Sequence, residues 1–89
     1  MNFLLPQERS GTLREVRAVD IHSDHYLDVW VVFDEPTGET RRARVPVSEC
    51  PTDLVAGDRV SVKFVMGVVV KVARTTEPAP PVAEPSDPL

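Results

Sequence analysis

The chain contains few of the residues that stabilise or anchor small proteins. Its 89 residues include one cysteine, Cys50, which excludes an internal disulfide and suits a reducing compartment. No apolar run approaches the roughly 20 residues of a membrane span, and the opening MNFLLP is too short for the apolar part of a signal peptide. We therefore expect a cytoplasmic protein that does not enter a membrane.

The sequence also lacks the motifs of common catalytic and metal sites. It has no glycine-rich phosphate loop, no nucleophile elbow and no pair of cysteines. His22 and His25 are three residues apart, but a structural zinc site needs four ligands and no other histidine or nearby cysteine completes one. Cys50 precedes a proline and is typical of a small buried hydrophobe. We expect no enzymatic activity, no metal and no small-molecule cofactor.

Charge is unevenly distributed along the chain. The net charge is -4, yet residues 11–74 hold nine basic and ten acidic residues, whereas residues 75–89 hold three acidic residues and no basic one. The acidity therefore belongs to the C-terminal end. An almost neutral folded part attracts nucleic acid only through a local basic patch.

The pattern of the chain predicts one small all-β domain with two flanking segments. Valine-rich alternating runs and regularly spaced turn residues fill residues 11–74, and a domain of this size has a thin core. Residues 1–10 are interpreted as an N-terminal arm. Residues 75–89 are rich in proline and acidic residues, and we expect a disordered tail there.

Two hairpins organise the predicted domain. A first strand over Thr12–Ile21 precedes a second over Tyr26–Asp34, whose turn Pro36-Thr37-Gly38 predicts a three-residue loop with positive φ at Gly38. Pairing Glu35 with Glu39 places Trp30 opposite Arg44 and Val32 opposite Arg42.

The later hairpin follows the same reasoning. A loop Val65-Met66-Gly67, with positive φ at Gly67, sets Phe64 opposite Val68 and Val62 opposite Val70. The expected core consists of Leu27, Val29, Val31, Val45, Val60, Val62, Phe64, Val70 and Val72.

Four features together resemble a known family of small barrels. They are the first strand opening at Gly11-Thr12-Leu13, the long hairpin of the second and third strands, the connector ending in Gly57-Asp58-Arg59-Val60, and the final strand led by Gly67 and ending at Arg74. This arrangement is similar to an OB-fold of the cold-shock and bacterial initiation-factor-one type, which implies a five-stranded barrel. A Gly-Asp pair before a strand also occurs in SH3-like barrels, which are the alternative fold.

The resemblance implies a binding face on the outside of the second and third strands. The candidate residues there are Tyr26, Trp30, Arg42 and Arg44, and Arg14 and Arg17 on the first strand would widen the patch. A guanidinium beside an indole offers a flat platform for nucleic-acid bases. The arginines also fit an ordinary solvated strand face.

Two functions remain open at this point. The first is a non-enzymatic module that binds single-stranded RNA or DNA through this face. The alternative is a module for protein interaction or assembly, as a homodimer or with a partner, that uses Trp30, the apolar N-terminus Phe3-Leu4-Leu5 and the proline-rich tail. Salt separates them, because only phosphate contacts weaken steeply as ionic strength rises.

Overall fold

The computed structural model describes residues 6–35 and 38–76, and it shows an all-β chain. The described strands are antiparallel and form one five-stranded sheet: β1 (Gln7–Ile21), β2 (Asp24–Phe33), β3 (Thr40–Pro46), β4 (Arg59–Val65) and β5 (Val68–Arg74). One short 3-10 turn, η1 (Val47–Glu49), follows β3. The predicted all-β class is confirmed. No helix in residues 6–35 and 38–76 is long and apolar enough to cross a bilayer.

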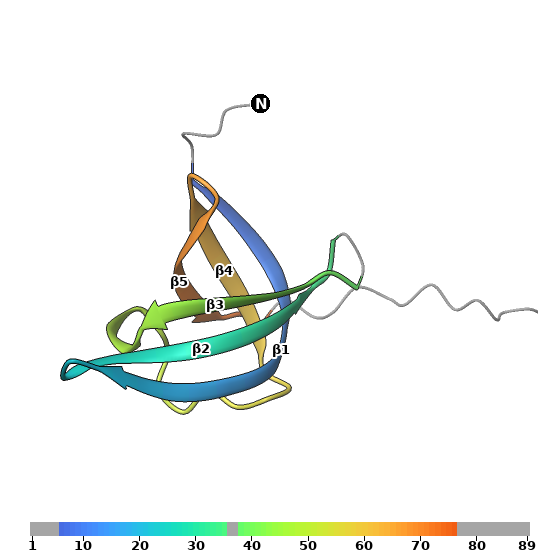
Figure 1. Ribbon diagram of the computed structural model, residues 1–89. Helices are drawn as coiled ribbons and strands as arrows, with labels where there is room; N and C mark the ends of the chain where they lie inside the picture. The colour runs from blue at the N-terminus through green and yellow to red at the C-terminus, as the bar shows by residue number, and fades with distance from the viewer. Residues whose placement is uncertain (1–5, 36–37, 77–89) are drawn as a thin grey trace, which may run out of the picture.

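The long strand β1 holds the two halves of the sheet together. The strand order is β3-β2-β1-β4-β5, and β1 pairs with β4 through its first residues and with β2 from Gly11 onward. Figure 1 shows β1 curving from the β2–β3 layer up to the β4–β5 layer. The strand begins at Gln7, so residues 7–10, which we had expected in an arm, belong to the sheet.

The sheet is barrel-like in outline. Its two end strands, β3 and β5, lie next to each other, although no ladder joins them in the part of the chain that the structure describes. Arg41 of β3 bridges this gap, because its guanidinium donates to the carbonyl of Gly67 at 2.9 Å. Of the tail expected at residues 75–89, the part from residue 77 onward lies outside the described residues.

The register predicted for the first hairpin is wrong by two residues. Trp30 pairs with Arg42 and Asp28 pairs with Arg44, and the ladder stops at the pair Val32 and Thr40. Gly38 does have the expected positive φ, at 88°, but Pro36 and Thr37 of the expected turn lie outside the described residues.

Tertiary contacts account for the longer loop. Asp34 accepts two hydrogen bonds from Arg59, at 2.9 and 2.7 Å, and Arg9 binds the carbonyl of Glu35 and the carboxylate of Glu39. These ion pairs hold loop residues away from the strand partners that turn chemistry alone would assign.

The second hairpin also differs from its predicted register. Met66 and Gly67 have φ of 54° and 81°, which is the pattern of a two-residue type I′ turn, so Val65 pairs with Val68. A bulge after Lys63 then makes Lys63 pair with Lys71 and leaves Val70 as the extra residue. The expected positive φ at Gly67 is confirmed, whereas the three-residue loop is wrong.

The core lies between the two halves of the bent sheet. The buried apolar residues are Leu13, Val29, Val31, Phe33, Val45, Leu54, Val60, Val62, Phe64 and Val72. Seven of the nine expected core residues are among them. Leu27 is half-buried against this cluster. Because of the bulge, Val69 packs against the cluster where Val70 was expected.

Candidate binding face on strands β1 to β3

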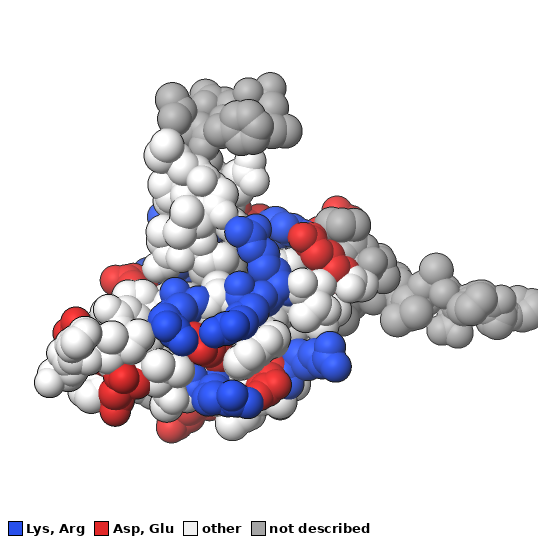
Figure 2. Space-filling view, in the orientation of Figure 1, with Lys and Arg blue, Asp and Glu red and all other residues white. Residues whose placement is uncertain are grey.

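Trp30 lies between two guanidinium groups on the outer face of the sheet. The guanidinium carbons of Arg17, on β1, and Arg42, on β3, are each 5.6 Å from the centre of its ring system. The indole is partly exposed. Figure 2 shows basic side chains gathered over this side of the molecule, with acidic atoms between them. The face therefore combines an accessible aromatic plane with positive charge.

Asp28 lies beneath the arginines of β3. It points to the same side of β2 as Trp30, yet only 4% of its surface is exposed. Arg44 donates to it from Nε to Oδ1 at 2.7 Å and from Nη2 to Oδ2 at 3.0 Å, and Arg42 adds a contact of 3.3 Å to Oδ2. This two-pronged geometry fixes the Arg44 fork. Asp28 is thus the anchor that orients the basic groups of the face.

The ion pair predicts a dependence of stability on acidity. The hydrogen bond from Arg44 holds the pKa of Asp28 below its ordinary value, against the opposing effect of burial. Below about pH 4 the unfolded chain takes up a proton at Asp28 more readily than the folded chain, so stability falls as the pH drops through the lowered pKa. Urea unfolding from pH 2 to pH 6 should show a flatter acid decline for Asp28→Asn than for the natural chain.

An acid decline of equal slope in the two proteins would contradict this role for Asp28. The ion pair with Arg59 lowers the pKa of the Asp34 carboxyl as well. It contributes the same acid-dependent loss of stability to both proteins and therefore serves as the internal reference.

The structure brings together most, but not all, of the candidate residues. Arg44 binds Asp28, so the predicted Trp30–Arg44 pair is replaced by Trp30 with Arg42 and Arg17. Tyr26 lies near the start of β2, paired with Pro46. Arg14 is exposed at the bulge between Leu13 and Glu15, and among the described residues it makes no hydrogen bond or ring contact with the other candidates.

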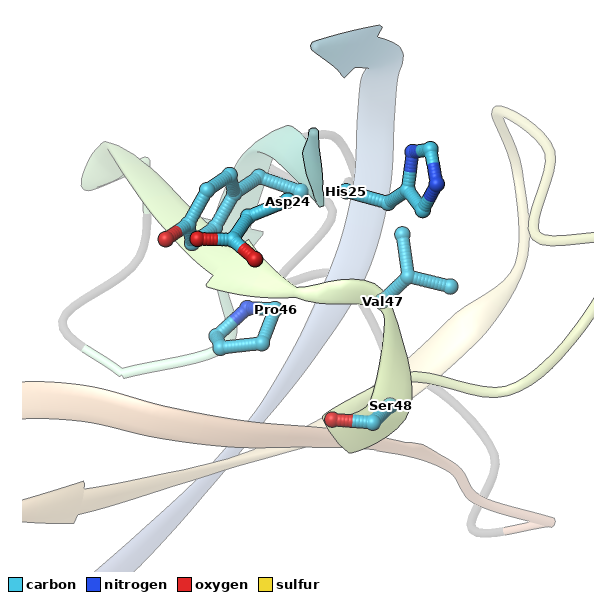
Figure 3. Close-up of a pocket in the computed structure, with 6 residues that line it drawn as sticks. Asp24, His25, Pro46, Val47 and Ser48 are labelled. Carbon is cyan, nitrogen blue, oxygen red and sulfur yellow. The ribbon is translucent and has the colours of Figure 1, made fainter. Parts of the chain in front are cut away.

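A shallow pocket continues the face beyond Tyr26. It is lined by Asp24, His25, Tyr26, Pro46, Val47 and Ser48. Figure 3 shows Asp24 and Pro46 on one side of the pocket and His25 and Val47 on the other. The apolar parts come from a phenol ring, a proline and a valine, so the pocket suits a flat or apolar group.

His25 contributes a titratable group at the rim of that pocket. The carboxylate of Asp20 binds its Nδ1 at 2.8 Å, and this hydrogen bond raises the pKa of the imidazole above its usual value. Protonation of His25 therefore adds positive charge at the rim at a higher pH than for a free histidine. No cluster of three or more potential metal ligands occurs in residues 6–35 and 38–76.

Two further interaction elements are expected from the sequence. Phe3-Leu4-Leu5 and the proline-rich tail lie outside the described residues. Cys50 is half-buried, and burial raises the pKa of its thiol to about 11, which leaves it protonated and unreactive at neutral pH.

No protein-family model, curated protein or solved structure matches the chain.

Proposed function

We propose that the protein is a non-enzymatic binding module that holds a single strand of RNA or DNA across the outer face of β1, β2 and β3. The observation that carries this proposal is the position of Trp30 between the guanidinium groups of Arg17 and Arg42. An accessible indole stacks with any base, and neighbouring arginines bind phosphates without regard to sequence. This chemistry favours a ligand with alternating flat and anionic groups.

The local charge supports the same ligand. Arg14, Arg17, Arg42 and Arg44 supply four positive charges to this part of the sheet, against two negative charges from Glu15 and Asp28, a local balance of +2 in a chain of net charge -4. The side chains of Arg42 and Arg44 are 57% and 42% exposed even while they contact Asp28. Their remaining N–H groups are available to phosphate oxygens.

The topology adds support at the level of the fold. A bent first strand that pairs with both β2 and β4, with β3 beside β5, is compatible with the OB type of barrel, which binds oligonucleotides on this part of the sheet. We therefore propose an OB-like rather than an SH3-like barrel.

The experiment that tests this function uses Trp30 as its own probe, since it is the only tryptophan. Adding an oligothymidylate of about twelve nucleotides should quench Trp30 emission, because a base stacks on the indole. Trp30→Ala, followed by fluorescence anisotropy of a labelled oligonucleotide, should weaken binding by roughly 5- to 150-fold at every salt concentration, since stacking contributes about 1–3 kcal/mol per base.

Two neighbouring arginines provide a matched comparison for the phosphate contacts. Arg42→Ala should reduce the slope of log affinity against log salt by about 0.7, the value for one phosphate contact on a single strand. Arg41→Ala should leave that slope unchanged, because Arg41 is directed to the barrel end, where its guanidinium lies over the Phe64 ring.

A different outcome would favour a protein interface. If Trp30 emission does not respond to oligonucleotides at low salt but changes with protein concentration, this face joins two copies of the chain. The exposed apolar side chains at the β4–β5 turn, Met66 and Val68, would then be further candidates for contact.

A further inference from the structure

A second concave surface lies on the outside of the β4–β5 hairpin. Ser61 and Lys63 of β4 alternate with the buried residues Val60, Val62 and Phe64, and Lys71 and Ala73 of β5 flank the buried Val72. Together with Glu8, Arg74 and Thr75, these outward residues line a pocket of about 330 Å³. The strands that form it are not those that carry Trp30.

Two lysines face each other across this pocket. Lys63 and Lys71 are directly paired in the β4–β5 ladder, and they are the only lysines of the chain. Side chains directly opposite on antiparallel strands start about 5 Å apart, and like charges in that position repel. The repulsion disappears when an anion lies between the two ammonium groups.

In the part of the chain that the structure describes, the lysines also differ from most other basic groups in having no partner. Within residues 6–35 and 38–76, neither lysine makes a hydrogen bond or an ion pair, whereas six arginines bind carboxylates and Arg41 binds a carbonyl. Glu8 is opposite Lys63 in the β1–β4 ladder, and the Ser61 hydroxyl donates to Glu8 at 3.5 Å. Among the described residues, one carboxylate thus faces two ammonium groups that have no ion-pair partner.

We propose that this pocket binds a phosphate group between Lys63 and Lys71. The two ammonium groups supply up to six N–H donors and two charges, and both lysines line the pocket. The phosphate belongs either to the backbone of a nucleic-acid strand or to a small phosphorylated molecule. The site goes beyond the function proposed for the Trp30 face and stands without it.

The test is an NMR titration of the full chain with inorganic pyrophosphate at constant ionic strength. The amide signals of Ser61, Lys63, Lys71 and Ala73 should shift and saturate, while the indole N–H of Trp30 stays in place. Lys71→Ala should weaken binding by about fivefold or more, the Coulomb contribution of one nearby charge in water.

Arg14→Ala is the matched control. It also removes one exposed positive charge, but from the other half of the sheet, so it should leave the pyrophosphate affinity unchanged. Equal losses in Lys71→Ala and Arg14→Ala, or shifts scattered over the surface, would overturn the proposal because they report only bulk charge.

Two further arms define the occupant. Replacing Glu77, Glu84 and Asp87 by their amides in the full chain should leave the four signals unchanged without pyrophosphate; a shift there would assign the pocket to the chain's own acidic segment and overturn the proposal. Shifts of the four signals with oligothymidylate would identify a strand phosphate, whereas a response to pyrophosphate alone would identify a small phosphorylated molecule. The indole N–H signal of Trp30 reports separately whether the proposal for the Trp30 face fails.

Discussion

Gly11→Ala should destabilise the fold by about 3 kcal/mol, the upper end of the usual cost of overpacking a close contact. A Cβ at this position would lie 2.5 Å from the carbonyl oxygen of Val32, 2.8 Å from Cγ1 of Val31 and 3.1 Å from the Cα of Phe33. Two of these atoms are backbone, so no change of rotamer relieves the contact. In a domain of this size the melting temperature should fall by roughly 12–24 °C, as measured by circular dichroism.

The cause lies in the position of Gly11 within β1. Gly11 lies where β1 pairs with both neighbouring strands, with Phe33 of β2 on one side and with Val60 of β4 on the other. The bent strand brings the β2 backbone against the α-carbon there, and only a residue without a side chain fits. Gly11 therefore allows one strand to serve both halves of the sheet.

Gly67→Ala is the control for this argument. Gly67 has a positive φ of 81°, and a Cβ built there meets no atom within 4 Å, so the substitution costs only backbone strain of about 1 kcal/mol. If the two alanine variants lose the same stability, the close contact at Gly11 is not what requires glycine.

The sequence predicts the faces of the strands better than their partners. The predicted register of the β2–β3 hairpin is wrong by two residues, and a slip of two keeps every side chain on its own face. Val29, Val31 and Val45 are therefore buried as expected, while Trp30 faces Arg42 in place of Arg44. Gly38 has the expected positive φ, so this angle does not distinguish the predicted register from the observed one. The ion pairs at Asp34 and Glu39 account for the longer loop.

Asp28 is the part of the site that alternation alone does not reveal. Its position in β2 places it on the outer face, where a carboxylate is ordinarily solvated, and the structure shows it almost completely covered. The signal available in the sequence is the pair Arg42 and Arg44 on the facing strand, which can close over an acid between them. Bulges at Arg14 and Val70 are likewise invisible in the pattern, because each adds one residue to an otherwise regular alternation.

Two arginine side chains lie over the phenylalanine rings of the core. Phe33 and Phe64 lie with ring centres 5.8 Å apart, and the guanidinium of Arg9 lies 4.0 Å from the centre of Phe33. On the other side, the guanidinium of Arg41 lies 5.1 Å from the centre of Phe64 and also binds the Gly67 carbonyl. Phe64 thus connects the core to Arg41, whose side chain bridges β3 and the β4–β5 turn.

Phe64→Ala should have the largest effect of the substitutions considered, with a loss of about 3–5 kcal/mol in the free energy of unfolding measured in urea. The change removes a ring that is 5% exposed and leaves a cavity beside Phe33. Because Arg41 loses the surface on which it lies, hydrogen exchange at the β5 amides next to β3 should also accelerate.

Phe64→Leu separates the two contributions of the ring. It keeps most of the buried volume and removes the aromatic face, so it should cost less than about 1.5 kcal/mol for packing, with a further 0.5–1 kcal/mol or so for the lost cation–π contact. Combining it with Arg41→Ala in a double-mutant cycle measures the coupling directly. A coupling energy of zero would show that Arg41 holds β3 to the β4–β5 turn through its hydrogen bond to Gly67 alone, without help from the Phe64 ring.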